Sequence, residues 1–151
     1  MLFRSGNYVQ FSYNTLDQFN NGITLSGWTR VTAKFRYDGS SGWEIRMWTL
    51  SNEIEYEGES EHNIQLSELE ITPISINSTD ASATVNVTFA LAEGHYDPML
   101  TNQVIAEGDG GTVGAAPPVE IELTITYKLG SMINKPDGLY FVNLVLLLVE
   151  K

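Results

Sequence analysis

Residues 119–129 read Val-Glu-Ile-Glu-Leu-Thr-Ile-Thr-Tyr-Lys-Leu, and every second side chain is apolar. Strict alternation over such a length is the pattern of a strand that buries one face and exposes the other. It predicts that Val119 and Ile121 face a core, while Glu120 and Glu122 face outward. The stretch therefore predicts an antiparallel β-protein whose sheets each have one polar face.

The same alternation recurs before and after this stretch, and no segment has the spacing of an amphipathic helix. The run Asp38–Gly42 lies between two alternating segments and predicts a hairpin. We predict that residues 1–151 form a single all-β domain, an antiparallel immunoglobulin-like β-sandwich of roughly seven to nine strands. Further strands are expected at residues 9–13, 30–37, 43–50, 82–91 and 139–150, with a short one at 103–106 inside the long segment 92–118.

The composition excludes several classes of function. The chain has a net charge of −11 and only 8 Lys and Arg residues, which excludes nucleic acid as a partner because binding there depends on neutralising phosphates. It has no Cys, and therefore no disulfide or thiolate nucleophile. Its longest apolar stretch, Phe141–Val149, is about half of the roughly 20 residues that a membrane helix needs, so we expect no membrane insertion.

Catalytic residue types are also scarce. The two histidines, His62 and His95, lie in polar sequence, and nothing resembles a nucleophile elbow. We therefore expect no enzymatic activity, no cofactor and no metal centre.

The last predicted strand is apolar on both faces, so both faces need a cover. One interpretation is a central strand with loops or a long side chain over its outer face. The other is an outer face that is buried by a neighbouring subunit. The candidate subunit contacts are Val9, Phe11, Tyr13, Tyr140, Val142, Leu144, Leu146 and Leu148.

Charge is segregated along the chain. Arg30, Lys34 and Arg36 share one face of a predicted strand, whereas Met47–Tyr127 contains no Lys or Arg. This basic stripe either pairs head to tail with acidic residues of a second copy, or is neutralised within its own sheet by Glu44 and other acidic neighbours. The candidate charge contacts are Arg30, Lys34, Arg36, Glu53, Glu55 and Glu57.

Five glutamates, Glu53, Glu55, Glu57, Glu59 and Glu61, occupy alternate positions. In an extended strand their carboxylates would line one face. We interpret them as a solvated edge that prevents unwanted strand pairing. A calcium site is the alternative, because clustered carboxylate oxygens suit hard cations.

Trp48 is the candidate aromatic for glycan stacking. Alternation places it on the strand face opposite Trp43, which is expected in the core. An exposed indole at Trp48 would offer a flat apolar surface to a sugar ring.

Three stretches carry a resemblance: Val9–Gly22 (V-Q-F-S-Y-N-T-L-D-Q-F-N-N-G), Gly42–Met47 (G-W-E-I-R-M) and Pro136–Val142 (P-D-G-L-Y-F-V). Together they resemble bacterial secreted immunoglobulin-like domains and pilin-like surface subunits. In such domains a Pro-x-Gly-x-Tyr segment opens the last core strand, and the Trp of the second hairpin fills the sandwich.

The resemblance implies a homopolymer, an extracellular or cell-surface fibre whose subunits donate a terminal strand to a neighbour. Met1–Gly6 or Asn7–Tyr13, within residues 1–13, would be the donor, and the last strand would be the acceptor. The N-terminal residues lack the apolar run of an export signal, so a virion decoration or tail component is an alternative. A carbohydrate-binding module with a glycan or host-surface ligand is another.

Overall fold

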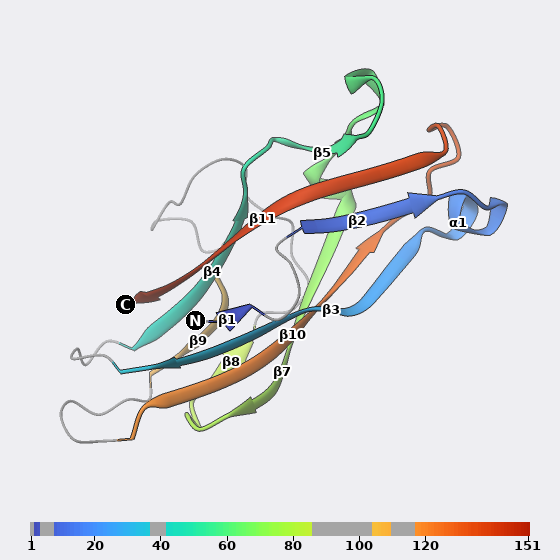
Figure 1. The fold of residues 1–151 in the computed structure, drawn as a ribbon. Helices are drawn as coiled ribbons and strands as arrows, with labels where there is room; N and C mark the ends of the chain where they lie inside the picture. The colour runs from blue at the N-terminus through green and yellow to red at the C-terminus, as the bar shows by residue number, and fades with distance from the viewer. Residues whose placement is uncertain (1, 4–7, 37–41, 86–103, 110–116) are drawn as a thin grey trace.

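The computed structural model describes residues 2–3, 8–36, 42–85, 104–109 and 117–151 (Figure 1). Its helical elements are α1 (Leu16–Asn21) and the 3-10 turns η1 (Ser60–His62) and η2 (Leu66–Glu68). Its strands are β1 (Leu2–Phe3), β2 (Tyr8–Tyr13), β3 (Ile23–Phe35), β4 (Trp43–Thr49), β5 (Glu53–Tyr56), β6 (Ile64–Gln65), β7 (Leu69–Ser78), β8 (Thr84–Val85), β9 (Val104–Gly108), β10 (Val119–Leu129) and β11 (Gly138–Glu150).

These strands form two sheets that pack together, and every pair in them is antiparallel (Figure 1). The first sheet has the order β1-β3-β10-β7. In the second, β5 and β4 pair with successive stretches of β11, β6 pairs with β5, β9 lies between β4 and β8, and β2 also pairs with β11. The chain is therefore an all-β sandwich, as its alternating sequence predicts.

The core lies between the two sheets and is built by the alternation. In β10 the buried residues alternate with outward ones from Val119 to Leu129, and Leu123 and Ile125 are fully buried. The Tyr127 hydroxyl, also buried, donates a hydrogen bond to the Thr29 Oγ1 at 3.0 Å. Strand β10 pairs with β3 on one side and β7 on the other, so its main-chain groups are satisfied along both edges.

A short helix that the alternation does not predict follows β2. The Thr15 side chain accepts a hydrogen bond from the Gln18 N–H, and the Gln18 side chain accepts one from the Thr15 N–H, which is a capping box. The helix ends at Gly22, whose φ of 79° favours glycine. A Cβ there would collide with the main chain of Leu129.

The hairpin expected at Asp38–Gly42 is wrong, because β3 and β4 belong to different sheets. The two flanking strands face each other across the core instead. The rings of Phe35 and Trp43 pack edge to face with centroids 5.4 Å apart. Alternation shows which face of a strand is buried, but it does not show which strand lies beside it.

The acidic strand expected at Glu53–Glu61 is shorter than predicted. Strand β5 ends at Tyr56, and residues Ser60–His62 form the turn η1. The glutamates therefore do not share one strand face.

Other expectations fall only partly on described residues. The short strand expected near 103–106 is present as β9, whereas only Thr84–Val85 of the strand expected at 82–91 is described as β8. Most of the segment 92–118 lies outside the described residues. In the described part of the chain, no helix has the length and apolar character needed to cross a membrane.

Candidate functional site

Strand β2 lies against the first half of β11, so the structure brings the candidate subunit contacts together within one chain. Val9 is opposite Val142, and Phe11 is opposite Tyr140. Their side chains face the chain's own core, and their role as contacts with a second subunit stays a prediction. Fully or largely buried are Val9, Phe11, Tyr13, Tyr140, Val142, Leu144 and Leu146, and Leu148 is partly buried.

The hydrogen bonds of β11 show which strands lie on which of its edges. Successive residues of an antiparallel strand direct their main-chain N–H and C=O to opposite edges. The Leu139 C=O accepts a hydrogen bond from the Glu57 N–H, and the Lys151 N–H donates one to the Gly42 C=O, each at 3.0 Å. Odd-numbered residues of β11 therefore face β5 and β4, and even-numbered residues face the opposite edge.

On that opposite edge, β2 pairs only with Gly138–Asn143. The second half of β11, Leu144–Glu150, pairs with β4. No strand within the described ranges pairs with the other edge of this second half. We call it the open edge, and it consists of the main-chain groups of Leu144, Leu146, Leu148 and Glu150.

The outward face of β11 is apolar next to this open edge. Phe141, Val145, Leu147 and Val149 alternate with the core residues and are only partly buried. The ring of Tyr8 stacks on Phe141 with centroids 5.5 Å apart and remains 42% exposed. A largely apolar strip therefore lies beside the open edge.

Trp48 and Arg46 also project from this outward face, yet both are buried. Trp48 is 7% exposed, so the expectation that it offers an exposed ring to a glycan is wrong. Arg46 pairs with Glu44 at 2.6 Å, and Glu44 therefore neutralises this buried arginine rather than the basic stripe. The exposed tryptophan is Trp28 in β3, at 44%.

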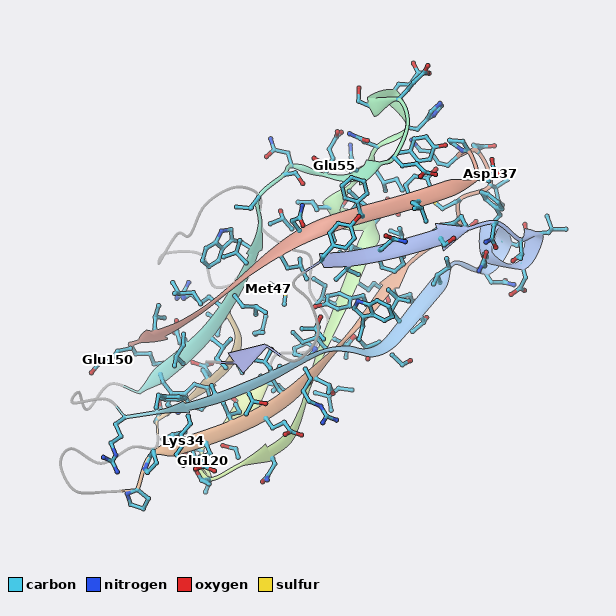
Figure 2. All side chains as sticks on the ribbon, viewed as in Figure 1. Lys34, Met47, Glu55, Glu120, Asp137 and Glu150 are labelled. Atoms are coloured by element: carbon cyan, nitrogen blue, oxygen red, sulfur yellow. The ribbon has the colours of Figure 1, made fainter. Side chains whose placement is uncertain are left out.

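The basic stripe is largely neutralised by its own sheet. Arg30 lies 3.9 Å from Glu122 across the β3–β10 pair. Lys34 forms an ion pair with Glu120 across the same pair of strands (Figure 2). Arg36, one residue beyond β3, is exposed and has no such partner among the described residues. The acidic partners come from outward positions of β10.

Two of the acidic candidates beside β11 accept hydrogen bonds from main-chain and amide groups. The Glu57 side chain accepts a hydrogen bond from the Leu139 N–H at 3.1 Å, and Glu53 accepts one from the Asn63 Nδ2 at 3.1 Å. Glu55 is opposite Phe141 in the β5–β11 pair. Glu57 and Glu53 therefore bind groups of the chain's own fold.

A small acidic group lies at η1. Ligand atoms of Glu59, Glu61 and His62 lie within 4.8 Å of one another, and Glu59 and Glu61 are exposed. Exposed carboxylates of this kind gather on many acidic surfaces without binding a cation. The cluster therefore does not define a calcium site.

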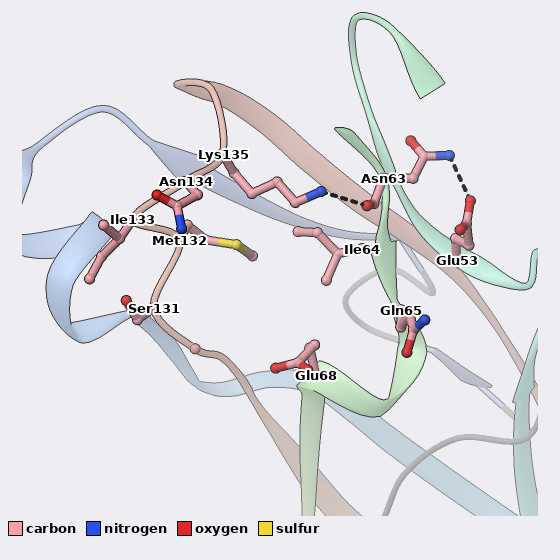
Figure 3. Close-up of a pocket in the computed structure, with 11 residues that line it drawn as sticks. Glu53, Asn63, Ile64, Gln65, Glu68, Ser131, Met132, Ile133, Asn134 and Lys135 are labelled. Atoms are coloured by element: carbon pink, nitrogen blue, oxygen red, sulfur yellow. Dashed lines mark hydrogen bonds between the residues drawn. The ribbon is translucent and has the colours of Figure 1, made fainter. Parts of the chain in front are cut away.

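An open groove of about 610 Å³ lies at the end of the sandwich where β10 connects to β11 (Figure 3). Ile64 and Met132, both 5% exposed, form its apolar floor, and Glu68 and Lys135 are among its polar lining. The groove is not apparent from the sequence because its walls come from segments far apart in the chain. The exposed apolar Ile133 in a polar connection was the available signal.

Three buried tyrosines fix this end of the core. The Tyr13 hydroxyl donates hydrogen bonds to the Leu129 and Gly130 carbonyls at 2.9 and 2.7 Å, and the Tyr140 hydroxyl donates one to the Pro136 carbonyl at 2.7 Å. Burial raises the pKa of Tyr140 to about 12 and also raises the pKa values of Tyr13 and Tyr127. These hydroxyls stay protonated and act as structural donors.

Comparisons with protein-family models, curated proteins and solved structures find no match to this chain. The site is therefore interpreted from its own geometry. Its main feature is the open edge of β11 with the apolar strip beside it.

Proposed function

We propose that the chain is a structural subunit of a self-assembling extracellular filament or surface layer, joined to a second copy at the open edge of β11. The observation that carries the proposal is that β2 covers only Gly138–Asn143 of that edge. The four residues of the open edge follow Asn143 and direct their main-chain N–H and C=O groups away from β4. An added strand would satisfy these groups and extend the second sheet.

The surroundings of the open edge also support this proposal. Natural proteins usually protect an exposed sheet edge with charges, prolines or a covering segment. Here the edge residues preceding Glu150 are Leu144, Leu146 and Leu148, and the adjacent outward face carries Val145 and Leu147. An incoming strand would therefore gain apolar contacts as well as hydrogen bonds.

The immunoglobulin-like part of the proposal is supported by Tyr140. Its hydroxyl binds the carbonyl of Pro136, four residues upstream, at the start of β11. The contact resembles the tyrosine corner of immunoglobulin-like sandwiches, in which a tyrosine hydroxyl binds the main chain a few residues upstream. It is consistent with the resemblance carried by the Pro136–Val142 segment.

The test uses two substitutions at one edge position, Leu148→Pro and Leu148→Ala. Both make the side chain smaller, but only proline removes the N–H that faces the open edge. We expect filaments or large assemblies from the wild-type chain and from Leu148→Ala, and their loss from Leu148→Pro. Light scattering against concentration, negative-stain electron microscopy and a thermal melt of each variant measure assembly and folding.

A wild-type chain that remains monomeric at every concentration would contradict the proposal. If the folded Leu148→Pro and Leu148→Ala variants assemble equally well, the joint does not lie at the open edge. Closed particles in place of filaments would favour a virion component, because the same joint could serve a closed assembly.

A cysteine pair distinguishes addition of a new strand from exchange of β2. Tyr8 is opposite Asn143, and the chain contains no other Cys, so Tyr8→Cys with Asn143→Cys joins β2 to β11 on oxidation. If the joint is a strand added at the open edge, oxidised assemblies give monomers on a non-reducing gel. A ladder of covalent oligomers would show that β2 is exchanged between copies.

A further inference from the structure

The groove of Figure 3 has two walls that are held in place by the fold. One wall is the connection between β10 and β11, where the Ser131 Oγ and the Met132 N–H both donate to the Phe19 carbonyl of α1 at 2.8 Å. The other wall is β6 and η2, anchored by the buried Ile64 and Leu66. The groove is therefore preformed, which reduces the entropic cost of filling it.

The lining of the groove is suited to a long cationic side chain. Its floor is apolar, and Glu68 projects into the open space between the walls (Figure 3). Glu68 is exposed and makes no ion pair or side-chain hydrogen bond with any described residue. The one ammonium in the lining, that of Lys135, donates to the Asn63 carbonyl at 3.1 Å.

Within the described ranges, one cationic side chain makes no contact with a charged or polar partner. Arg36 is the one arginine or lysine of the described segments whose side chain makes neither an ion pair nor a hydrogen bond with them. The others are engaged: Arg30 with Glu122, Lys34 with Glu120, Arg46 with Glu44, Lys128 with Glu70, Lys135 with Asn63, and Lys151 with Glu107 and Asp109.

Arg36 and the groove lie at opposite ends of the sandwich. In the β3–β10 pair, Phe35 is opposite Val119 at one end and Ile23 is opposite Leu129 at the other. Arg36 follows the first end, and the groove wall begins after the second. Figure 2 shows the same separation, with Lys34 and Glu120 at one end and Asp137 at the other. Arg36 therefore cannot reach the groove of its own chain.

We propose that the groove binds Arg36 of a second copy, so that subunits contact one another head to tail. This inference rests on the proposed self-assembly and adds a second contact to the strand joint. The methylene stem of the arginine would lie on Ile64 and Met132, and its guanidinium would reach Glu68. Because the two surfaces are different, the contact is heterologous, and each subunit can bind a further one through its free surface.

The test combines two charge reversals, Arg36→Glu and Glu68→Lys. Alone, each variant places like charges at the contact, and we expect its association to weaken at least about tenfold, which corresponds to 1.4 kcal/mol. An equal mixture should assemble again. In it, the introduced glutamate meets the introduced lysine at one contact, and the native Arg36 meets the native Glu68 at the next.

Matched controls carry the same changes in charge elsewhere. Glu61→Lys alters an exposed carboxylate outside the groove, and Lys128→Glu alters an exposed lysine of β10. We expect both to assemble within about threefold of the wild type, as for exposed charges. Sedimentation of each sample and of the mixture at equal ionic strength gives the comparison.

The outcomes separate this inference from the proposed function. If Leu148→Pro abolishes assembly but neither charge reversal weakens it, the head-to-tail contact is wrong and the strand joint stands. If the reversals weaken assembly and the mixture fails to recover, Arg36 and Glu68 do not meet between copies. A monomeric wild-type chain overturns both proposals.

Discussion

Strands β10 and β11 are consecutive in the described chain and occupy central places in the two sheets, but their surroundings differ. Strand β10 has neighbours on both edges, and its outward side chains are mostly charged or threonine. Strand β11 has described neighbours on both edges only in its first half, and its outward side chains are mostly apolar. The comparison shows that β10 is paired along both edges within one chain, whereas β11 has an edge and a face suited to further contacts.

The largest expected difference between the two strands is in the free energy of unfolding that is lost when a leucine is replaced by alanine. Leu123 of β10 is fully buried, so Leu123→Ala should lower the free energy of unfolding by about 2–5 kcal/mol. Leu148 of β11 is partly buried at the open edge, and Leu148→Ala should cost less than about half as much. Urea denaturation of the monomeric protein measures both, and equal losses would show that the second half of β11 is as enclosed as β10.

Alkaline pH should destabilise both sheets through their tyrosines. Burial raises the pKa of Tyr140 from 10.0 to about 12, and burial also raises the pKa of Tyr127 in β10. The unfolded chain loses these protons first, so this stability is complete below pH about 10 and falls as the pH rises towards about 12. Urea titrations across this window should show the decline, and Tyr140→Phe should make it shallower. If stability declines with pH as steeply in Tyr140→Phe as in the wild type, Tyr140 does not contribute to the decline.

A smaller difference between the two strands is expected in the stability lost when one tyrosine hydroxyl is removed from each. Tyr127→Phe breaks a buried hydrogen bond with Thr29 and should cost about 1–1.5 kcal/mol. Tyr140→Phe breaks the bond to the Pro136 carbonyl in a partly buried turn, where water can replace the donor, and should cost less. Thermal unfolding of both variants tests the order. A larger loss for Tyr140→Phe would mean that the turn before β11 is more important than the interior bond of β10.

The smallest expected effect comes from the charged outer face of the first sheet. Lys34 and Glu120 are both half-exposed or more, so their ion pair should contribute less than about 1 kcal/mol. A double-mutant cycle with Lys34→Met and Glu120→Gln at low and high salt measures this coupling. A coupling that is larger and independent of salt would contradict the view that these charges mainly keep the outer face polar.

Alternation predicted β10 and β11 well because burial depends on local sequence, but β7 was not among the expected strands. The ends of β10 coincide with the expected range, and β11 begins one residue before Leu139. Alternation could not place β3 and β4 in different sheets, because strand neighbours depend on contacts between distant segments. The short helix α1 was missed, although Thr15 and Gln18 carry the spacing of a capping box.

The candidate site was less accessible to sequence reasoning than the fold. Trp48 lies on the face opposite Trp43 as predicted, yet that part of the outer face is covered and the ring is buried. The open edge depends on where β2 stops along β11, and no local pattern states the length of a pairing. The groove depends on Glu68 and Met132, which only the folded chain brings together.

The pairing of β2 with β11 also sets an order of events during synthesis. Residues Tyr8–Tyr13 leave the ribosome long before Gly138–Asn143, with which they pair. Until β11 is made, the buried side chains of β2 lack the partner that covers them, and long-range pairing of this kind forms slowly. A nascent chain therefore passes through a period in which β2 needs protection, and a chaperone that occupies the place of β11 would raise the yield of folded protein.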